Sequence, residues 1–329
     1  MGVQVPLLAP IEDKRVIILF FICNNYKHMF TLMLVLWYTN HSGDNMIYLK
    51  KFNLLNENAE SNLINGENRT YVKNRYPCNI FPERGLENIE FDTITFIYGG
   101  NGSGKSTVLN IIAEAINAQR ERQFGKGEMF TNYIKLCNYE FIKKPSEVKI
   151  ISSDDVFEYL FNIRRINYGI YDKREDLFNE YFDKKYNSSS IKDYEELVNA
   201  VDAKKMSLSK FVKKRVPVVE MPEQSNGESA LMYFAQVIKE NGLYILDEPE
   251  NSMSASMQIK LAHFLEDSAR FFNCQFIIAT HSPFLLNIKY AKIYDLDSYP
   301  ARVKKYSELE NVRIYYNFFK ENAKDFEEK

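Results

Sequence analysis

The chain has 329 residues and a mass of 38.6 kDa, enough for one large α/β domain that carries an insertion. Hydrophobic residues make up 45% and charged residues 26% of it, values that exclude a disordered chain, a collagen and a disulfide scaffold. The 42 basic and 44 acidic residues give a net charge of −2, so contact with nucleic acid or an anionic membrane needs a local patch. The four cysteines lie far apart without a C-x-x-C pair, which favours a cytoplasmic protein.

Residues 1–45 differ in composition from the rest of the chain. Two apolar runs, VIILFFIC and MFTLMLVLWY, flank the polar segment NNYKH, and neither reaches the roughly 18 to 20 residues that a membrane helix needs. The acidic Glu12 and Asp13 and the lack of a small-residue cleavage site argue against a signal peptide. The genetic code allows residues 3–10 to be encoded by a DNA sequence that matches the T-loop and the CCA end of a transfer RNA gene. We therefore expect an N-terminal extension that is either not translated or poorly structured, a true start at Met46, and no stable membrane insertion.

A phosphate-binding loop follows an expected strand. The run ITFIY at residues 94–98 leads into GGNGSGKST, and the next segment, VLNIIAEAINA, has the apolar spacing of a helix. The spacing G-x-x-x-x-G-K-S lets backbone N–H groups converge on phosphate oxygens at the helix N-terminus. Lys105 is predicted to act in catalysis by reaching the β- and γ-phosphates of ATP, and Ser106 to offer its hydroxyl to Mg²⁺. The residues predicted to bind the nucleotide here are Gly99, Gly100, Asn101, Gly102, Ser103, Gly104, Lys105, Ser106 and Thr107.

Two further apolar runs end in polar residues. Residues 243–246, LYIL, lead to Asp247 and Glu248, and residues 276–279, FIIA, lead to a threonine and His281. Ligands bind at the carboxyl ends of strands in open α/β sheets. Asp247 is therefore predicted to hold Mg²⁺, Glu248 to polarise the attacking water, and His281 to hydrogen-bond the γ-phosphate or that water. The alternatives are a strand that ends in a solvated acidic turn and a histidine with a structural role.

The order of the motifs carries a family resemblance. GGNGSGKST, SNGES, LYILDEPENSMS and IIATHSPFLL follow one another between residues 99 and 286. This series resembles the ABC-type P-loop ATPases, most closely the soluble, non-transporter "AAA family" ATPases of the RecF, SMC and OLD-like branch. The resemblance implies an α/β fold with a central, mostly parallel sheet flanked by helices and a helical lobe inserted between the phosphate loop and the signature motif. It is specific for the superfamily and much less so for a biological role.

The resemblance also implies residue roles. Ser225 and Gly227 match the signature motif, which grips the γ-phosphate of the nucleotide bound to the other subunit, and Ser254 matches a serine at the dimer seam. Glu248 matches the general base and His281 the switch histidine. The implied protein is a head-to-tail homodimer that sandwiches two ATP molecules, with Mg²⁺ as the metal.

Two departures from the family pattern argue against a transporter subunit. The expected strand at residues 148–151 is followed by SSDD where the family has a glutamine loop, so that Asp154 or Asp155 would replace the glutamine at the metal. The signature reads SNGES, without two consecutive glycines and a glutamine.

The chain is expected to divide into the extension, 1–45, and an ATPase domain, 46–329. Within that domain we expect a nucleotide-binding core at 46–118 and 225–300, an inserted helical lobe at 119–224 and a C-terminal helical tail at 301–329. Between Lys204 and Arg215 the lobe carries six basic residues and no acidic one. This run is either a contact for nucleic-acid phosphates or a solvated helix face.

These observations predict an ATP-binding and ATP-hydrolysing protein that works as an ATP-gated homodimer in DNA maintenance or repair, or in defence against mobile DNA. DNA or a separate effector protein is the expected further partner. One alternative is the nucleotide-binding subunit of an ABC transporter. The other is a nucleotide-dependent interaction module without turnover, and the presence of Glu248 argues against this second alternative. Tyr71, Tyr76 and Phe81 precede the loop at a distance suited to stacking on adenine.

Overall fold

The computed structural model describes residues 15–18, 35–38, 46–66, 75–122, 124–186, 198, 201–202, 205–206, 208–215 and 225–327. The chain forms two compact units, Met1–Met46 and Ile47–Lys329. In the first unit, β1 (Arg15–Ile18) pairs antiparallel with β2 (Val35–Tyr38). Most of residues 1–45, expected to be untranslated or poorly structured, lie outside the described residues.

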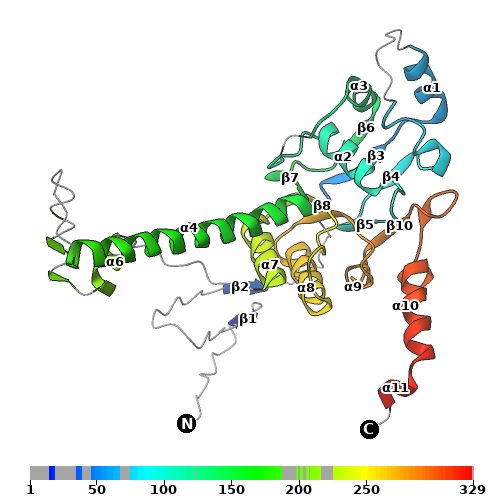
Figure 1. Ribbon diagram of the computed structural model, residues 1–329. Coiled ribbons are helices and arrows are strands. Elements are labelled where there is room, and N and C mark those ends of the chain that lie inside the picture. The colour runs from blue at the N-terminus through cyan, green and yellow to red at the C-terminus, as the bar shows by residue number, and fades with distance from the viewer. Residues whose placement is uncertain are drawn as a thin grey trace. The chain divides into compact units, whose positions relative to one another are not determined.

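Six strands form the main sheet of the second unit, in the order β11-β10-β5-β9-β8-β7. The neighbours from β10 to β7 are parallel, and only the short β11 is antiparallel. The strands are β5 (Ile94–Tyr98), β7 (Glu147–Ser152), β8 (Gly242–Asp247), β9 (Gln275–Ala279), β10 (Lys292–Asp295) and β11 (Arg302–Val303). Parallel neighbours need long crossovers, which here contain helices (Figure 1). This architecture confirms the α/β fold expected from the motif order.

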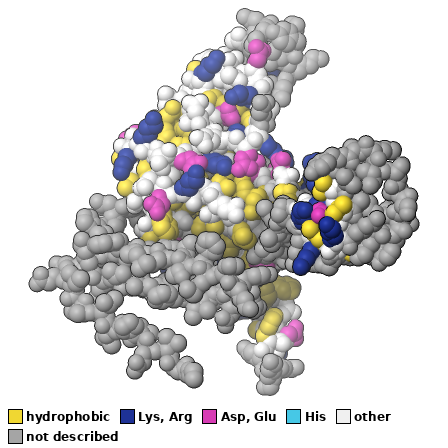
Figure 2. All heavy atoms as spheres, turned by 90° about the vertical axis from the view of Figure 1, so that its left-hand side faces the viewer, with side chains coloured by type: hydrophobic (Ala, Val, Ile, Leu, Met, Phe, Trp, Pro, Cys, Tyr) yellow, Lys and Arg dark blue, Asp and Glu magenta, His cyan; other side chains and the backbone are white. Residues whose placement is uncertain are grey.

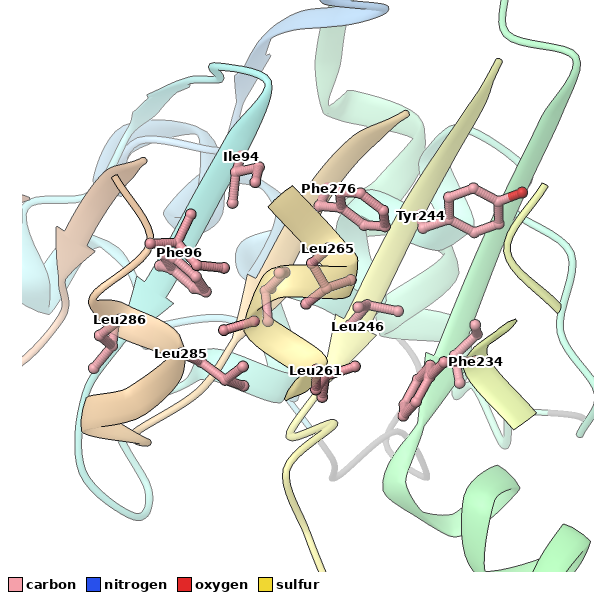
Figure 3. Close-up of a cluster of buried hydrophobic side chains, with 14 of the residues drawn as sticks. Ile94, Phe96, Phe234, Tyr244, Leu246, Leu261, Leu265, Phe276, Leu285 and Leu286 are labelled. Carbon is pink, nitrogen blue, oxygen red and sulfur yellow. The ribbon is translucent and has the colours of Figure 1, made fainter. Parts of the chain in front are cut away.

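The hydrophobic core lies on both faces of this sheet, because successive residues of a strand point to opposite faces. Phe96, Leu246 and Ile278 are fully buried on the face covered by α7 (Asn226–Val237), α8 (Ala255–Phe271) and α9 (Pro283–Leu286). Figure 3 shows Phe234, Leu261, Leu265 and Leu285 of these helices against the strands. The helix after the phosphate loop, α2 (Lys105–Ala115), contacts β8 and β9.

A smaller antiparallel sheet was not expected from the sequence. Its order is β4-β3-β6, with β3 (Leu49–Asn53) between β4 (Asn88–Glu90) and β6 (Asn138–Phe141). Buried Gln275 joins it to the main sheet, because its Oε1 accepts the N–H groups of Tyr48 and Leu49 and its Nε2 donates to the Leu49 carbonyl. The shorter helices nearby are α1 (Glu57–Asn65), η1 (Pro82–Arg84) and α3 (Glu128–Leu136).

The helical lobe starts later than expected. Residues 119–152 contain α3, β6 and β7, of which β7 belongs to the main sheet, so the boundary expected at residue 119 differs from the structure. The long helix α4 (Ser153–Tyr186) follows β7, and α6 (Leu208–Arg215) lies against it (Figure 1). Their contact buries Ile170, Leu177, Tyr181 and Phe211.

The C-terminal segment contains β11, η2 (Tyr306–Glu308), α10 (Glu310–Glu321) and α11 (Lys324–Glu327). Leu309 and Val312 anchor it in the core. The remaining large apolar side chains of α10 are exposed: Ile314, Tyr315, Tyr316, Phe318 and Phe319. This tail therefore covers little of the domain. A helix with the length and apolar content to cross a membrane does not occur in the part of the chain that the structure describes.

Candidate active site

The phosphate-binding loop connects β5 to α2, as the pattern of strand, glycine loop and helix predicts. Gly104 has φ +96°, a left-handed conformation that favours glycine. A Cβ added there would lie 3.0 Å from Ile80 Cγ2 and 3.4 Å from Phe81 Cε1. Because α2 begins directly at Lys105, the positive end of its dipole faces the loop. The loop thus has the build of an anion site.

Lys105 lies folded back under this loop. Its Nζ donates to the carbonyl oxygens of Gly99 at 2.8 Å and Gly100 at 3.0 Å, and lies 3.8 Å from Glu248 Oε1. The lysine side chain is 5% exposed. A buried ammonium group needs such partners, and here they hold a positive charge where phosphate oxygens would converge.

Asp297, which is not among the predicted site residues, contacts the phosphate-binding loop. The Gly100 N–H donates to Asp297 Oδ2 at 2.7 Å. Asp297 follows β10, the strand that pairs in parallel with β5, so the loop and this carboxylate lie at the same edge of the sheet. No motif marks this residue in the sequence, since its place depends on the strand order.

Ser106 and Asp247 meet at the end of β8. Ser106 Oγ donates to Asp247 Oδ1 at 3.1 Å. Burial raises the pKa of Asp247 to about 6, against the lowering effect of the bond from Ser106. Mg²⁺ is usually held by one or two protein oxygens together with waters and phosphate oxygens. A hydroxyl and a carboxylate in contact beside a phosphate-binding loop fit that ligand set.

Glu248 lies between a lysine and a histidine. Its Oε1 is 3.8 Å from Lys105 Nζ and 3.6 Å from His281 Nδ1, and its Oε2 accepts from Asn251 Nδ2 at 3.2 Å. The Glu248 backbone has φ +49°, a left-handed conformation uncommon outside glycine and frequent at functional sites. Its N–H donates to the Ala279 carbonyl at 2.9 Å, which ties the turn after β8 to the end of β9.

The signature residues make no hydrogen bond or ion pair with the phosphate loop within the described ranges. Ser225 caps α7 in a capping box with Glu228 and is exposed. Gly227 is buried, and a Cβ on it would lie 2.9 Å from Met257 Cγ, so close packing of α7 on α8 also accounts for this glycine. Ser254 is exposed at the start of α8. Their action on a nucleotide stays a prediction.

The acidic residues expected in place of the glutamine loop have other partners. Asp155 Oδ2 accepts from the Ser152 N–H and Oγ, each at 2.8 Å, and so caps the start of α4. Asp154 Oδ2 lies 4.0 Å from an Arg122 nitrogen. Ser152 itself is paired with Asp247 in the register of β7 and β8, so this turn lies beside the predicted metal ligand.

Of the three aromatic residues considered for adenine stacking, Tyr76 lies at the loop. Its hydroxyl donates to Thr107 Oγ1 at 3.1 Å, and its ring stacks on Phe130 with centroids 5.6 Å apart. Phe81 is fully buried in the core, and Tyr71 is outside the described residues. Of the residues that the structure describes, Tyr76 is therefore the candidate for the adenine contact, and the assignment of Tyr71 stays a prediction.

The basic run in the lobe has an acidic counterpart. Lys214 Nζ and Arg215 each lie 2.9 Å from Asp202 Oδ2, while Lys204 is outside the described residues and Lys210 is exposed. Among the coloured side chains on the face in Figure 2, basic and acidic groups lie interspersed. The pairing with Asp202 favours the solvated-face alternative.

The fold and the order of its motifs define an ABC-type P-loop ATPase. More narrowly, the chain belongs to the AAA family described as "AAA domain, putative AbiEii toxin, Type IV TA system", whose model matches residues 94–287, more than half of the chain. The match spans all the catalytic and metal-binding residues predicted above. No curated protein matches the chain.

Solved structures similar to the chain include ATPase heads and a transporter. The SMC head domain from Thermotoga maritima is 13% identical, with 79% of this chain and 99% of that chain covered and a TM-score of 0.32. An SMC head bound to the C-terminal winged-helix domain of ScpA is 16% identical, with coverage of 66% and 92% and a TM-score of 0.32. "An inward-facing conformation of a putative metal-chelate type ABC transporter" is 18% identical, with coverage of 68% and 78% and a TM-score of 0.31. At TM-scores this low, these likenesses say nothing about function.

Proposed function

We propose that the protein hydrolyses ATP with Mg²⁺ and does so as an ATP-gated homodimer. The observation that carries the hydrolysis is the meeting of five side chains at the carboxyl ends of β5, β8 and β9. Lys105 and His281 lie 3.8 Å and 3.6 Å from one Glu248 oxygen, and Ser106 contacts Asp247 at 3.1 Å. Phosphoryl transfer depends on positioning and charge neutralisation, and this group supplies both.

Each residue has a distinct proposed role. ATP with its metal, when bound, supplies the electrophilic phosphorus and a charge that stabilises the leaving group. Lys105 exchanges the carbonyl oxygens of the loop for phosphate oxygens, and Ser106 and Asp247 hold the Mg²⁺. Glu248 orients the attacking water and accepts its proton, and His281 donates a hydrogen bond to the γ-phosphate or positions that water.

The dimer part of the proposal rests on the signature residues. Ser225 is exposed at the start of α7, and by the family resemblance it completes the site of a second copy. A site shared by two chains makes the dimer stable only while the γ-phosphate is intact.

Sedimentation of Glu248→Gln tests the dimer. With ATP and Mg²⁺ the variant should form a dimer that persists, because nucleotide binds and is not cleaved. With ADP, or with Lys105→Ala added, it should sediment as a monomer. Glu321→Gln, an exposed glutamate on α10, serves as the matched control and should sediment as the wild type. A monomeric Glu248→Gln at saturating ATP contradicts the dimer.

For the biological role we propose DNA maintenance or repair, or defence against mobile DNA, in the cytoplasm. The description of the family, which names a toxin of a type IV toxin–antitoxin system, supports the defence role. Free, buried thiols at Cys78, Cys137 and Cys274 suit a reducing compartment.

The DNA part is tested by the ATPase rate with and without double-stranded DNA over a range of salt. Stimulation that fades as salt rises supports a phosphate contact. A rate indifferent to DNA contradicts that contact and favours a separate effector protein.

A further inference from the structure

We propose that Glu250 is a positioning residue that holds His281 at Glu248. The inference rests on the proposed function, because it names the residue that fixes the histidine of that site. Glu250 lies three residues after the predicted metal ligand and was given no role by the sequence motifs. Its side chain is 5% exposed, so it is part of the interior behind the site and not of the nucleotide-facing surface.

One oxygen of Glu250 accepts hydrogen bonds from Thr280 and from the His281 backbone. Its Oε1 accepts from Thr280 Oγ1 at 2.5 Å and from the His281 N–H at 3.3 Å. Thr280 Oγ1 in turn accepts the Ser282 N–H at 3.0 Å. The carboxylate thus holds Thr280 and the His281 backbone directly and Ser282 through the Thr280 hydroxyl. The imidazole itself is 44% exposed and open to the nucleotide.

The same contacts close into a ring that joins two turns. Ser282 Oγ donates to Gln258 Oε1 at 2.6 Å, and Gln258 Nε2 donates to the Met253 carbonyl at 2.9 Å. The Met253 N–H then donates to the Glu250 carbonyl at 3.0 Å. The turn after β8, which carries Glu248, and the turn after β9, which carries His281, therefore behave as one unit.

A buried glutamate at this position lowers the stability of the fold, because one of its oxygens, Oε2, lacks a hydrogen-bond partner in the described part of the chain. Burial raises the pKa of Glu250, and the bonds from Thr280 and the His281 backbone oppose that rise. The hydrogen bonds that Glu250 accepts from Thr280 and from the His281 N–H fix the turn that carries the histidine, and a catalytic side chain depends on such placement.

The test uses the hydroxyl that links Glu250 to the histidine turn, because Thr280→Val keeps the shape of the side chain. We expect kcat for ATP hydrolysis to fall about 10- to 100-fold while KM for ATP stays unchanged, since Lys105 and the loop keep their contacts. Thr280→Ser, which retains the hydroxyl, should restore the rate. The control is Thr95→Val, because Thr95 is also fully buried and its hydroxyl binds a backbone N–H at the far end of β5. It should leave kcat at the wild-type value.

A double-mutant cycle separates positioning from general stability. If Thr280 and Glu250 act through the imidazole, Thr280→Val with His281→Ala should be no slower than His281→Ala alone, and Glu250→Gln with His281→Ala should behave likewise. Rate losses that multiply, or a Thr280→Val enzyme with wild-type kcat, overturn the inference. A His281→Ala enzyme with wild-type kcat instead removes the proposed role of the histidine and the inference with it.

Discussion

Ser106 and Asp247, 141 residues apart in the sequence, meet at a hydroxyl to carboxylate distance of 3.1 Å. The register of the sheet brings them together. Ala279 at the end of β9 pairs with Ile97 of β5 on one side and with Asp247 of β8 on the other. The helix that starts after the phosphate loop therefore begins opposite the acidic end of β8, and a metal held there would lie beside the phosphates.

Lys105→Ala should weaken ATP binding about 10- to 100-fold, because charged hydrogen bonds of ~1.5–3 kcal/mol are lost. Calorimetric titration with ATP and Mg²⁺ measures this. Lys126→Ala is the control, since Lys126 is half exposed and paired with Glu114 outside the loop. Equal affinities of Lys105→Ala and the wild type would exclude Lys105 as a phosphate ligand.

Asp297→Ala should raise KM for ATP several-fold, with a smaller effect on kcat. The change removes the acceptor of the Gly100 N–H. The loop then loses at most about 1.5–3 kcal/mol of stabilisation, the range for a hydrogen bond to a charged group. Asp267→Ala, an exposed aspartate on α8, is the comparison. If both variants have the same KM for ATP as the wild type, Asp297 does not position the loop.

Asp247→Asn should stabilise the protein free of nucleotide and metal at about pH 7.5. The pKa of Asp247 is raised to about 6 from a usual 3.8, so ionisation opposes folding. As pH rises from 3.8 to 6 the unfolded state loses its proton before the folded state does, and stability falls across that interval. The gain in Tm should therefore be present above pH 6 and absent near pH 4. A gain independent of pH would show that ionisation is not its cause.

Leu265→Ala should lower the free energy of unfolding by about 2–5 kcal/mol, because it opens a cavity in a core where Leu265 is fully buried (Figure 3). Denaturant titration measures the loss. Ile259→Ala on the same helix, where Ile259 is 43% exposed, should cost much less. Similar losses for both variants contradict the placement of the core on this face of α8.

The sequence motifs predict most of the fold and most of the candidate site. The apolar runs at residues 94–98, 243–246 and 276–279 each end in a turn that carries predicted site residues, and all three are neighbouring strands of the main sheet. This works because a buried parallel strand needs an apolar run, and its carboxyl end needs polar residues. Within the described part of a single chain, no contact tests the roles predicted for Ser225 and Gly227 of the signature motif. These roles therefore stay predictions.

Other features depend on contacts that the sequence does not encode locally. Glu250 is one more acidic residue in DEPEN, and its role emerges only from the Thr280 hydroxyl 30 residues away. Gln275 joins β3 to the main sheet across 226 residues. The short strand β6 has four residues, all exposed or half-buried, so a buried apolar run does not mark it in the sequence. The lobe predicted to begin at residue 119 begins after β7 in the structure.

The steady-state rate of phosphate release measures whether Glu248 serves as the general base of the proposed ATPase site. Wild-type protein with ATP and Mg²⁺ should turn over, whereas Glu248→Gln should bind ATP with similar affinity and release phosphate at least about 100-fold more slowly. Phosphate release by Glu248→Gln at the wild-type rate would exclude Glu248 as the general base.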